Sequence, residues 1–254
     1  MKDIHSHILF DIDDGSCSIE ESLEILKQAV SNNYTDIILT PHYRKRQNYV
    51  ANNKVKLERF DELLNEVKKE KLKVNLYLGN EVTVDEDLIY YLDTKQVVSL
   101  NSSRYILLEL PFTSKLDCLE DLFDELFDRG MIPIIPHPER YTGYKIEDYK
   151  RWIERGVLFQ GNIETLYNGY GEKSKKILTE MLKCHMIHFM GSDIHKASHG
   201  TYDRNIKEKL EEILQDKKMV LELTDKNIEC VIKNKEIKPY KVLEEKKRFK
   251  IFNR

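Results

Sequence analysis

The sequence predicts an α/β protein of the distorted, TIM-like (β/α)7 barrel class. Two observations carry this prediction: short β-branched or apolar runs alternate with amphipathic stretches of helical period, and seven such units follow one another. Alternating strands and helices are typical of parallel strands joined by right-handed crossovers, and seven units suit a barrel better than an open sheet. Because no linker rich in Pro, Gly or Ser divides the chain, we expect one domain over residues 1–254.

Seven short segments are the expected strands. In chain order they are residues 3–4, 36–39, 74–78, 105–108, 132–135, 157–160 and 186–189. The first helix is expected to begin after Ser18, because Ser18 and Glu21 have the spacing of a capping box. The second helix has a face formed by Leu57, Phe60, Leu64 and Val67. Three more helices are expected at about 116–126, 147–154 and 173–182, and glycines at 130 and 156 are typical of helix ends.

Composition narrows the class of protein. The 41 Lys and Arg against 44 Asp and Glu leave a net charge of −3, so no general field for nucleic acid is expected. The four cysteines are far apart in the sequence, no apolar run approaches the roughly 18 residues of a membrane span, and the N-terminus has no signal-like apolar stretch. We therefore expect a cytoplasmic protein with reduced thiols. The basic end at about 244–254 (Lys246, Lys247, Arg248, Lys250 and Arg254) is expected to be a solvated tail.

Imidazoles and carboxylates follow six of the seven expected strands. They are His5, His7, His42, Glu81, Glu109, His137, Asp193 and His195. In a barrel of parallel strands these positions lie at one face, so the side chains are expected to converge there. A mixed nitrogen and oxygen set without thiolates suits Mn²⁺, Fe or Zn²⁺, and it exceeds the three or four protein ligands of one catalytic ion. The sequence thus predicts a centre with more than one metal ion.

The motifs at these strand ends resemble those of the PHP (polymerase and histidinol phosphatase) family, and more closely its bacterial capsular-polysaccharide-type tyrosine-protein phosphatases. They lie, in order, at residues 3–15, 39–44, 78–82, 104–109, 136–141 and 191–195. The resemblance runs from residue 1 to about 235. It implies a distorted (β/α)7 barrel with three divalent metal ions, usually manganese. It also implies hydrolysis of phosphotyrosine on a bacterial tyrosine autokinase of capsule or exopolysaccharide synthesis.

The resemblance also implies which residues bind metal. The three groups are His5, His7, Glu81 and Asp193; then Glu81, Glu109 and His137; and finally His42 with His195. Asp14 completes the last group in preference to Asp13, because it is the second acid of the family's Asp-Asp-Gly. The expected nucleophile is a metal-bridging hydroxide, and no cysteine lies in a phosphate-binding C-x₅-R loop.

Three basic side chains are candidates for substrate binding. Arg140 is the expected catalytic and phosphate-binding residue, because a guanidinium binds two phosphoryl oxygens in parallel. Arg44 follows His42 and is a second candidate. Many relatives carry an arginine after the Asp-x-His motif, and Lys196 or Arg204 would replace it here.

Two other functions stay open from the sequence. One is a small-molecule phosphatase of the histidinol-phosphatase type, which shares the chemistry and changes the substrate. The other is a module that binds a phosphorylated kinase without turnover. A nuclease is disfavoured, because the charge is near neutral and no basic stripe is present. His185 and His188 are expected to be structural, and His199 is left open.

Overall fold

The computed structural model describes residues 1–244, so the predicted basic end beyond Glu244 lies outside the described residues. Within this range all strand pairs are parallel and form two sheets. The first contains β1 (Lys2–Asp3), β2 (Asp36–Leu39) and β4 (Asn75–Leu78). The second contains, in spatial order, β3 (His42–Tyr43), β5 (Glu81–Thr83), β6 (Tyr105–Glu109), β7 (Ile132–Pro136), β8 (Leu158–Asn162) and β9 (Phe189–Gly191).

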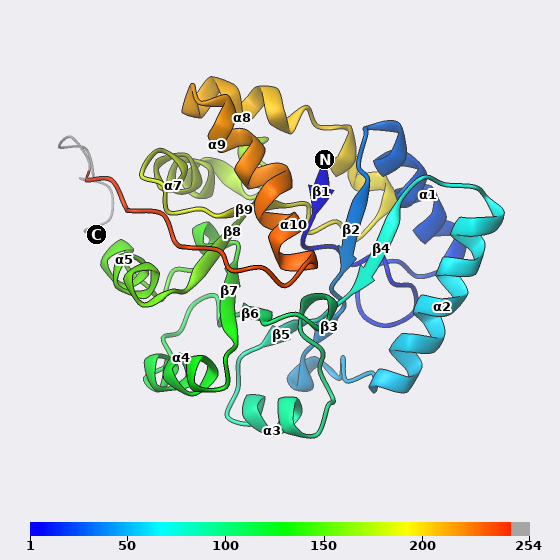
Figure 1. The fold of residues 1–254 in the computed structure, drawn as a ribbon, viewed down its shortest axis with the longest axis horizontal. Helices are drawn as coiled ribbons and strands as arrows, with labels where there is room; N and C mark the ends of the chain where they lie inside the picture. Colours follow the sequence, from blue (N-terminus) through cyan, green and yellow to red (C-terminus); the bar gives the residue numbers. More distant parts are fainter. Residues whose placement is uncertain (245–254) are drawn as a thin grey trace.

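The two sheets are parts of one series of strands. β3 continues β2 and β5 continues β4 after short breaks, and β5 pairs with β6. At the other end of the series, a parallel bridge joins Ser6, after β1, to Ile194, after β9. The helices lie around the strands in Figure 1. This is the predicted α/β class, and six of the seven predicted strands match within one to two residues at either end.

The last strand differs from the prediction. It runs over Phe189–Gly191, whereas the apolar pattern indicated 186–189. Residues 184–186 instead end the preceding helix, because the amides of His185 and Met186 donate to the carbonyls of Leu182 and Met181. Pairing with β8 then begins only at Phe189, opposite Gln160.

All five predicted helices are present, but the buried face of the second one differs from the prediction. They are α1 (Ile19–Ser31), α2 (Asn53–Lys69), α4 (Leu119–Asp128), α5 (Ile146–Arg155) and α7 (Gly171–Lys183). Ser18 accepts a hydrogen bond from the Glu21 amide at the start of α1, but the Glu21 carboxylate accepts from Cys17 rather than from Ser18. In α2, Leu57 is 52% exposed and Lys56 is buried in its place, which corrects the predicted apolar face.

Five further α-helices were not predicted. They are α3 (Leu88–Asp93), α6 (Ile163–Leu166), α8 (Ile206–Leu214), α9 (Lys217–Leu221) and α10 (Asn227–Ile232). α10 lies across the strands (Figure 1), and its Ile228 and Val231 join the core formed by inward-facing strand residues such as Ile38, Leu107 and Ile134. Within residues 1–244, no helix is both long and apolar enough to cross a membrane.

Candidate metal centre

The carboxyl ends of the strands bring all nine predicted metal ligands into one cluster. His5 and His7 follow β1, His42 begins β3, Glu81 begins β5, Glu109 ends β6, His137 follows β7, and Asp193 and His195 follow β9. Seven of the nine are buried, whereas His195 is partly exposed and Asp14, in the loop after β1, is exposed. Strand ends far apart in the sequence thus place their imidazoles and carboxylates at one face.

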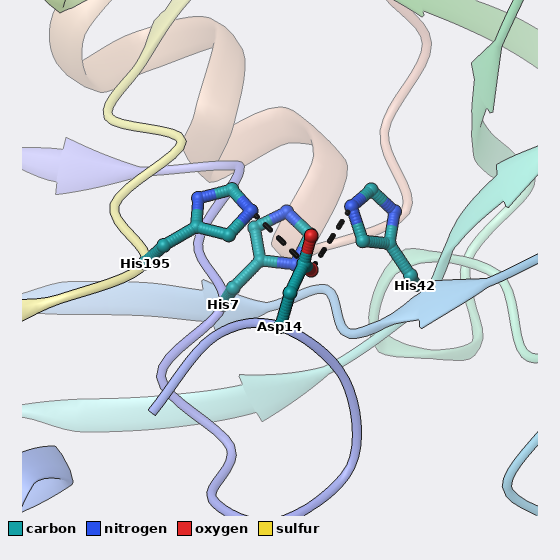
Figure 2. A group of neighbouring side chains, drawn as sticks. All are labelled: His7, Asp14, His42 and His195. Atoms are coloured by element: carbon teal, nitrogen blue, oxygen red, sulfur yellow. Dashed lines mark ion pairs between the residues drawn. The ribbon is translucent and has the colours of Figure 1, made fainter. Parts of the chain in front are cut away.

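The most accessible part of the cluster contains His7, Asp14, His42 and His195. Their potential ligand atoms all lie within 4.8 Å of one another. Figure 2 shows the Asp14 carboxylate between the rings of His42 and His195, with an oxygen 3.5 Å from His42 Nε2 and 3.7 Å from His195 Nε2. The His7 ring stacks on His195 with centroids 4.0 Å apart. These four side chains could hold one cation.

Glu81 lies at the centre of the buried part. Its Oε2 is 3.4 Å from the Nε2 atoms of both His5 and His7, and 2.8 Å from Nδ1 of His42. The two Nε2 atoms are 3.1 Å apart, and Asp193 Oδ1 lies 3.3 and 3.4 Å from them. Two further groups with the spacing of metal ligands therefore share Glu81. They are His5, His7 and Glu81, and His42, Glu81 and Glu109.

By spacing alone, the side chains fall into groups that overlap only in part with the three that the resemblance implied. Glu109 groups with His42 and Glu81, whereas the ion pair of His137 is with Glu81, with Nε2 3.0 Å from Oε1. The register of the second sheet explains the difference, because β3 pairs with β5 so that His42 lies opposite Glu81. His42 thereby reaches two of the three groups.

Two buried polar atoms indicate that the cluster suits cations. Glu81 Oε2 accepts no hydrogen bond despite its three close imidazole nitrogens, and His137 Nδ1 is also buried without a partner. An unsatisfied buried carboxylate oxygen is costly, and coordination to a divalent ion would relieve it. The donors are nitrogen and oxygen atoms without a thiolate, which matches the predicted set.

Neighbouring charged groups and burial shift the pKa values of several side chains in the cluster. Burial opposes the charged form of His5, but Glu81 and Asp193 outweigh it and raise the pKa of His5 to about 9. Burial likewise opposes ionisation of Glu81, yet His5 and His42 hold its pKa well below the ordinary value. Burial, together with the charge of His7, lowers the pKa of His195 to about 4. Glu81 is thus held ionised, as a carboxylate ligand of a divalent cation must be.

The sequence reasoning missed the residues that orient the candidate ligands. His5 Nδ1 donates to Gln160 Oε1 and His7 Nδ1 donates to Asp13 Oδ2, both at 2.7 Å, so the Nε2 atoms face the centre. Asn162 donates to Asp193 Oδ2 at 2.8 Å. The available signal was that Gln160 and Asn162 are polar residues within a strand whose other side chains are apolar.

Asp13 and Asp14 have different surroundings. Asp13 is buried and also accepts hydrogen bonds from the backbone amides of Gly15 and His42. Although burial raises its pKa, the neighbouring His7 lowers it to about 2. Asp14 instead faces His42 and His195. Of the two acids, Asp14 is therefore the one placed to reach a cation directly.

The predicted substrate-binding residues occupy different places. Arg140 lies at the cluster, with Nη1 3.2 Å from Asp193 Oδ2. Arg44 also lies at the cluster, where it donates hydrogen bonds to Glu109 and Thr83. Lys196 donates to the Gly15 carbonyl, so it ties the loop after β9 to the loop that carries Asp14.

The remaining basic candidates lie apart from these contacts. Arg204 pairs with Glu164, and His199 is exposed. His188 is buried at the amino end of β9, where it accepts a hydrogen bond from the Phe159 amide, and burial lowers its pKa to about 3. His188 is therefore structural.

Known proteins share both the sequence and the fold. The family described as "Capsular polysaccharide synthesis, CpsB/CapC" matches residues 1–233. A "Putative tyrosine-protein phosphatase CapC" of Staphylococcus aureus is 37% identical over 235 residues, which cover 87% of this chain and 91% of that one. "Tyrosine-protein phosphatase YwqE" of Bacillus subtilis is 32% identical over 201 residues, which cover 78% of each chain.

A solved structure agrees over nearly the whole length. It comes from work on YwqE of Bacillus subtilis and CpsB of Streptococcus pneumoniae, described as "unique metal-dependent tyrosine phosphatases". It superposes with a TM-score of 0.85 at 28% identity and covers 96% of this chain and 100% of that one. A dihydroorotase-like domain of Chaetomium thermophilum, with a TM-score of 0.53 at 12% identity over 93% of this chain and 79% of that one, shares the fold alone. The chain belongs to the CpsB/CapC family of capsular polysaccharide synthesis.

Proposed function

We propose that this protein is a metal-dependent protein-tyrosine phosphatase, a phosphoric monoester hydrolase. The observation that carries the proposal is the cluster around Glu81, in which a buried carboxylate oxygen without a hydrogen bond faces three imidazoles. Family membership and the relatives named as tyrosine-protein phosphatases support the same reaction. The substrate would be phosphotyrosine on a bacterial tyrosine autokinase that controls capsule or exopolysaccharide synthesis, and the enzyme would act in the cytoplasm.

The cluster would hold three divalent ions, with manganese expected and iron or zinc as alternatives. The overlapping ligand groups support more than one ion, because His7, His42 and Glu81 each belong to two of them. When bound, such ions supply a water-derived nucleophile at neutral pH and neutralise charge on the transferring phosphoryl group. Asp13 and Gln160 keep the Nε2 atoms of His7 and His5 directed at the centre.

Arg140 would bind the phosphoryl oxygens. Its guanidinium lies next to Asp193 and is partly exposed to solvent. A phosphate group bound at the cluster could therefore accept hydrogen bonds from it. Although burial opposes its charge, Asp193 raises the pKa of Arg140 above the ordinary value, so it stays cationic. Arg44, which already bonds Glu109, would add a second positive charge near the same ligands.

Two measurements on the same preparation test the proposal. Elemental analysis of protein purified without chelator should find two or three equivalents of a transition metal. The value of kcat/KM with added Mn²⁺ should be higher for a phosphotyrosyl peptide than for histidinol phosphate. A strong preference for histidinol phosphate would indicate the small-molecule enzyme, and capture of a phosphorylated kinase without phosphate release would indicate the binding module.

A further inference from the structure

We propose that Phe112 and Tyr170 are positioning residues that hold the Arg140 guanidinium ready to bind a phosphate monoester. The inference deepens the proposed function and rests on it, because it takes phosphate as the ligand of Arg140. Three loops meet here. Phe112 follows β6, Arg140 ends a short 3-10 turn after β7, and Tyr170 precedes α7.

The two rings hold the guanidinium without using its hydrogen-bond donors. Arg140 Cζ lies 4.8 Å from the centroid of Phe112 and 4.2 Å from that of Tyr170, each over the ring. Attraction between a cation and a ring face leaves the N–H groups available. In the part of the chain that the structure describes, the Arg140 side chain donates a single hydrogen bond, from Nη1 to Asp193. Since a guanidinium has five N–H donors, enough remain to bind two phosphoryl oxygens in parallel.

Arg44 provides a contrast within the same cluster. Its guanidinium donates hydrogen bonds to Thr83, Gln47 and Glu109, and Nη2 also lies 3.4 and 3.3 Å from the two ring nitrogens of His42. Its donors are therefore largely used by the protein. The Arg140 guanidinium instead lies over the rings of Phe112 and Tyr170 and donates one hydrogen bond, to Asp193.

Phe112 is itself firmly placed. Its carbonyl accepts hydrogen bonds from the amide and the hydroxyl of Thr142, and its ring stacks on the predicted ligand His137 with centroids 5.6 Å apart. Without the two rings, the guanidinium would be free to rotate onto Asp193 as a two-point ion pair. Such a pair would occupy both the donors that phosphate needs and a carboxylate that the metal needs.

The test is a double-mutant cycle with two readouts on manganese-loaded protein. The first is kcat/KM for a phosphotyrosyl peptide, and the second is the affinity for inorganic phosphate by titration calorimetry. Phe112→Ala and Tyr170→Ala should each lower both by roughly 3- to 30-fold. Tyr170→Phe keeps the ring and should restore most of the loss. In an Arg140→Ala background, the same ring substitutions should change either value by less than about twofold.

Controls separate this role from a purely structural one. The circular dichroism spectrum should be unchanged in both ring variants. Metal content should be unchanged in Tyr170→Ala, and it is measured for Phe112→Ala as well because that ring also stacks on His137. Tyr90→Ala, which removes an exposed tyrosine of α3, should affect neither readout. Equal losses with and without Arg140 would overturn the proposal. If wild type hydrolyses no phosphotyrosyl peptide, the proposed function fails, but the phosphate affinities still decide whether the rings act through Arg140.

Discussion

Glu81 shows how a single buried side chain organises the metal centre. Its two oxygens face four imidazoles, those of His5, His7, His42 and His137, and one oxygen accepts no hydrogen bond. Although burial opposes its ionisation, His5 and His42 hold the pKa of this carboxyl well below the ordinary value, so it stays ionised. Removing these imidazoles should therefore weaken cation binding more than it disturbs the fold.

The first prediction concerns the double variant His5→Ala with His7→Ala. Phosphatase activity should be lost and the metal content should fall, because one of the ligand groups loses two of its three members. Elemental analysis and turnover of a phosphotyrosyl peptide check this. Since both imidazoles are fully buried, circular dichroism must show that the variant is folded. If it is not, His195→Ala, which removes a partly exposed ligand, serves in its place. Full turnover in a folded variant would contradict the ligand assignment.

A second prediction concerns Asp13, which acts through His7. Asp13→Asn keeps the shape of the side chain but removes the charge that orients the imidazole, so metal affinity should weaken by roughly 10- to 100-fold. Competition with a metal-binding dye measures the affinity. Asp11→Asn is a matched control, because Asp11 lies in the same loop and pairs with Arg59 at the surface. An equal loss in both variants would mean that the charge of the loop, rather than the contact with His7, matters.

Helix α2 shows how an element can bury a polar side chain. Lys56 is 1% exposed, and its Nζ donates to Asn80 Oδ1 at 2.7 Å and to the Gln96 carbonyl at 3.0 Å. Asn80, between β4 and β5, donates in turn to the carbonyl of Pro41. The lysine thereby links α2 to the two strand breaks that precede His42 and Glu81. Burial lowers the pKa of Lys56 to about 7.

The third prediction is a dependence of stability on pH. Between about pH 7 and pH 10, the unfolded chain retains the Lys56 proton that the folded protein releases, so the free energy of unfolding should rise with pH. Comparing pH 7 with pH 9, Lys56→Met should abolish about 2 kcal/mol of this rise. Urea unfolding of both proteins at the two pH values measures the difference. Lys54→Met, at an exposed position of the same helix, should follow wild type. Parallel profiles for wild type and Lys56→Met would exclude the effect.

The molecule as a whole brings the two ends of the strand series together at the metal centre. The His7 amide donates to the Ile194 carbonyl and the Asp193 amide donates to the His5 carbonyl, so ligands nearly 190 residues apart share one cluster. A cation bound there would connect loops from most of the strand ends. It would bind the folded chain and have no preformed site in the unfolded one.

The fourth prediction follows from this linkage. Adding Mn²⁺ at 100 times its dissociation constant to chelator-treated protein should stabilise the fold by about 2.7 kcal/mol. For a chain of this size, that corresponds to a rise in Tm of roughly 5 to 10 °C. Thermal unfolding followed by circular dichroism measures the shift. The His5→Ala with His7→Ala variant should show a smaller shift, and an equal shift would place the ion elsewhere.

Local patterns were enough to predict the fold class, most strand positions and eight of the nine clustered candidate ligands, whereas Asp14 came from the family resemblance. The reason is physical: apolar runs of strand length define where strands end, and parallel strands present those ends at one face. The polar residue after each strand therefore predicted a place in space as well as a place in the sequence.

Contacts between distant segments decided the rest. The register of β3 and β5 places His42 opposite Glu81, and β9 begins only at Phe189, after the turn that ends α7. Asn80 accepts a hydrogen bond from Lys56, so α2 buries Lys56 and exposes Leu57. Gln160 and Asp13 became orienting residues only because folding placed them behind His5 and His7. Strand register and the partners of buried polar groups depend on residues far away in the chain, so no local pattern of apolar and polar residues encodes them.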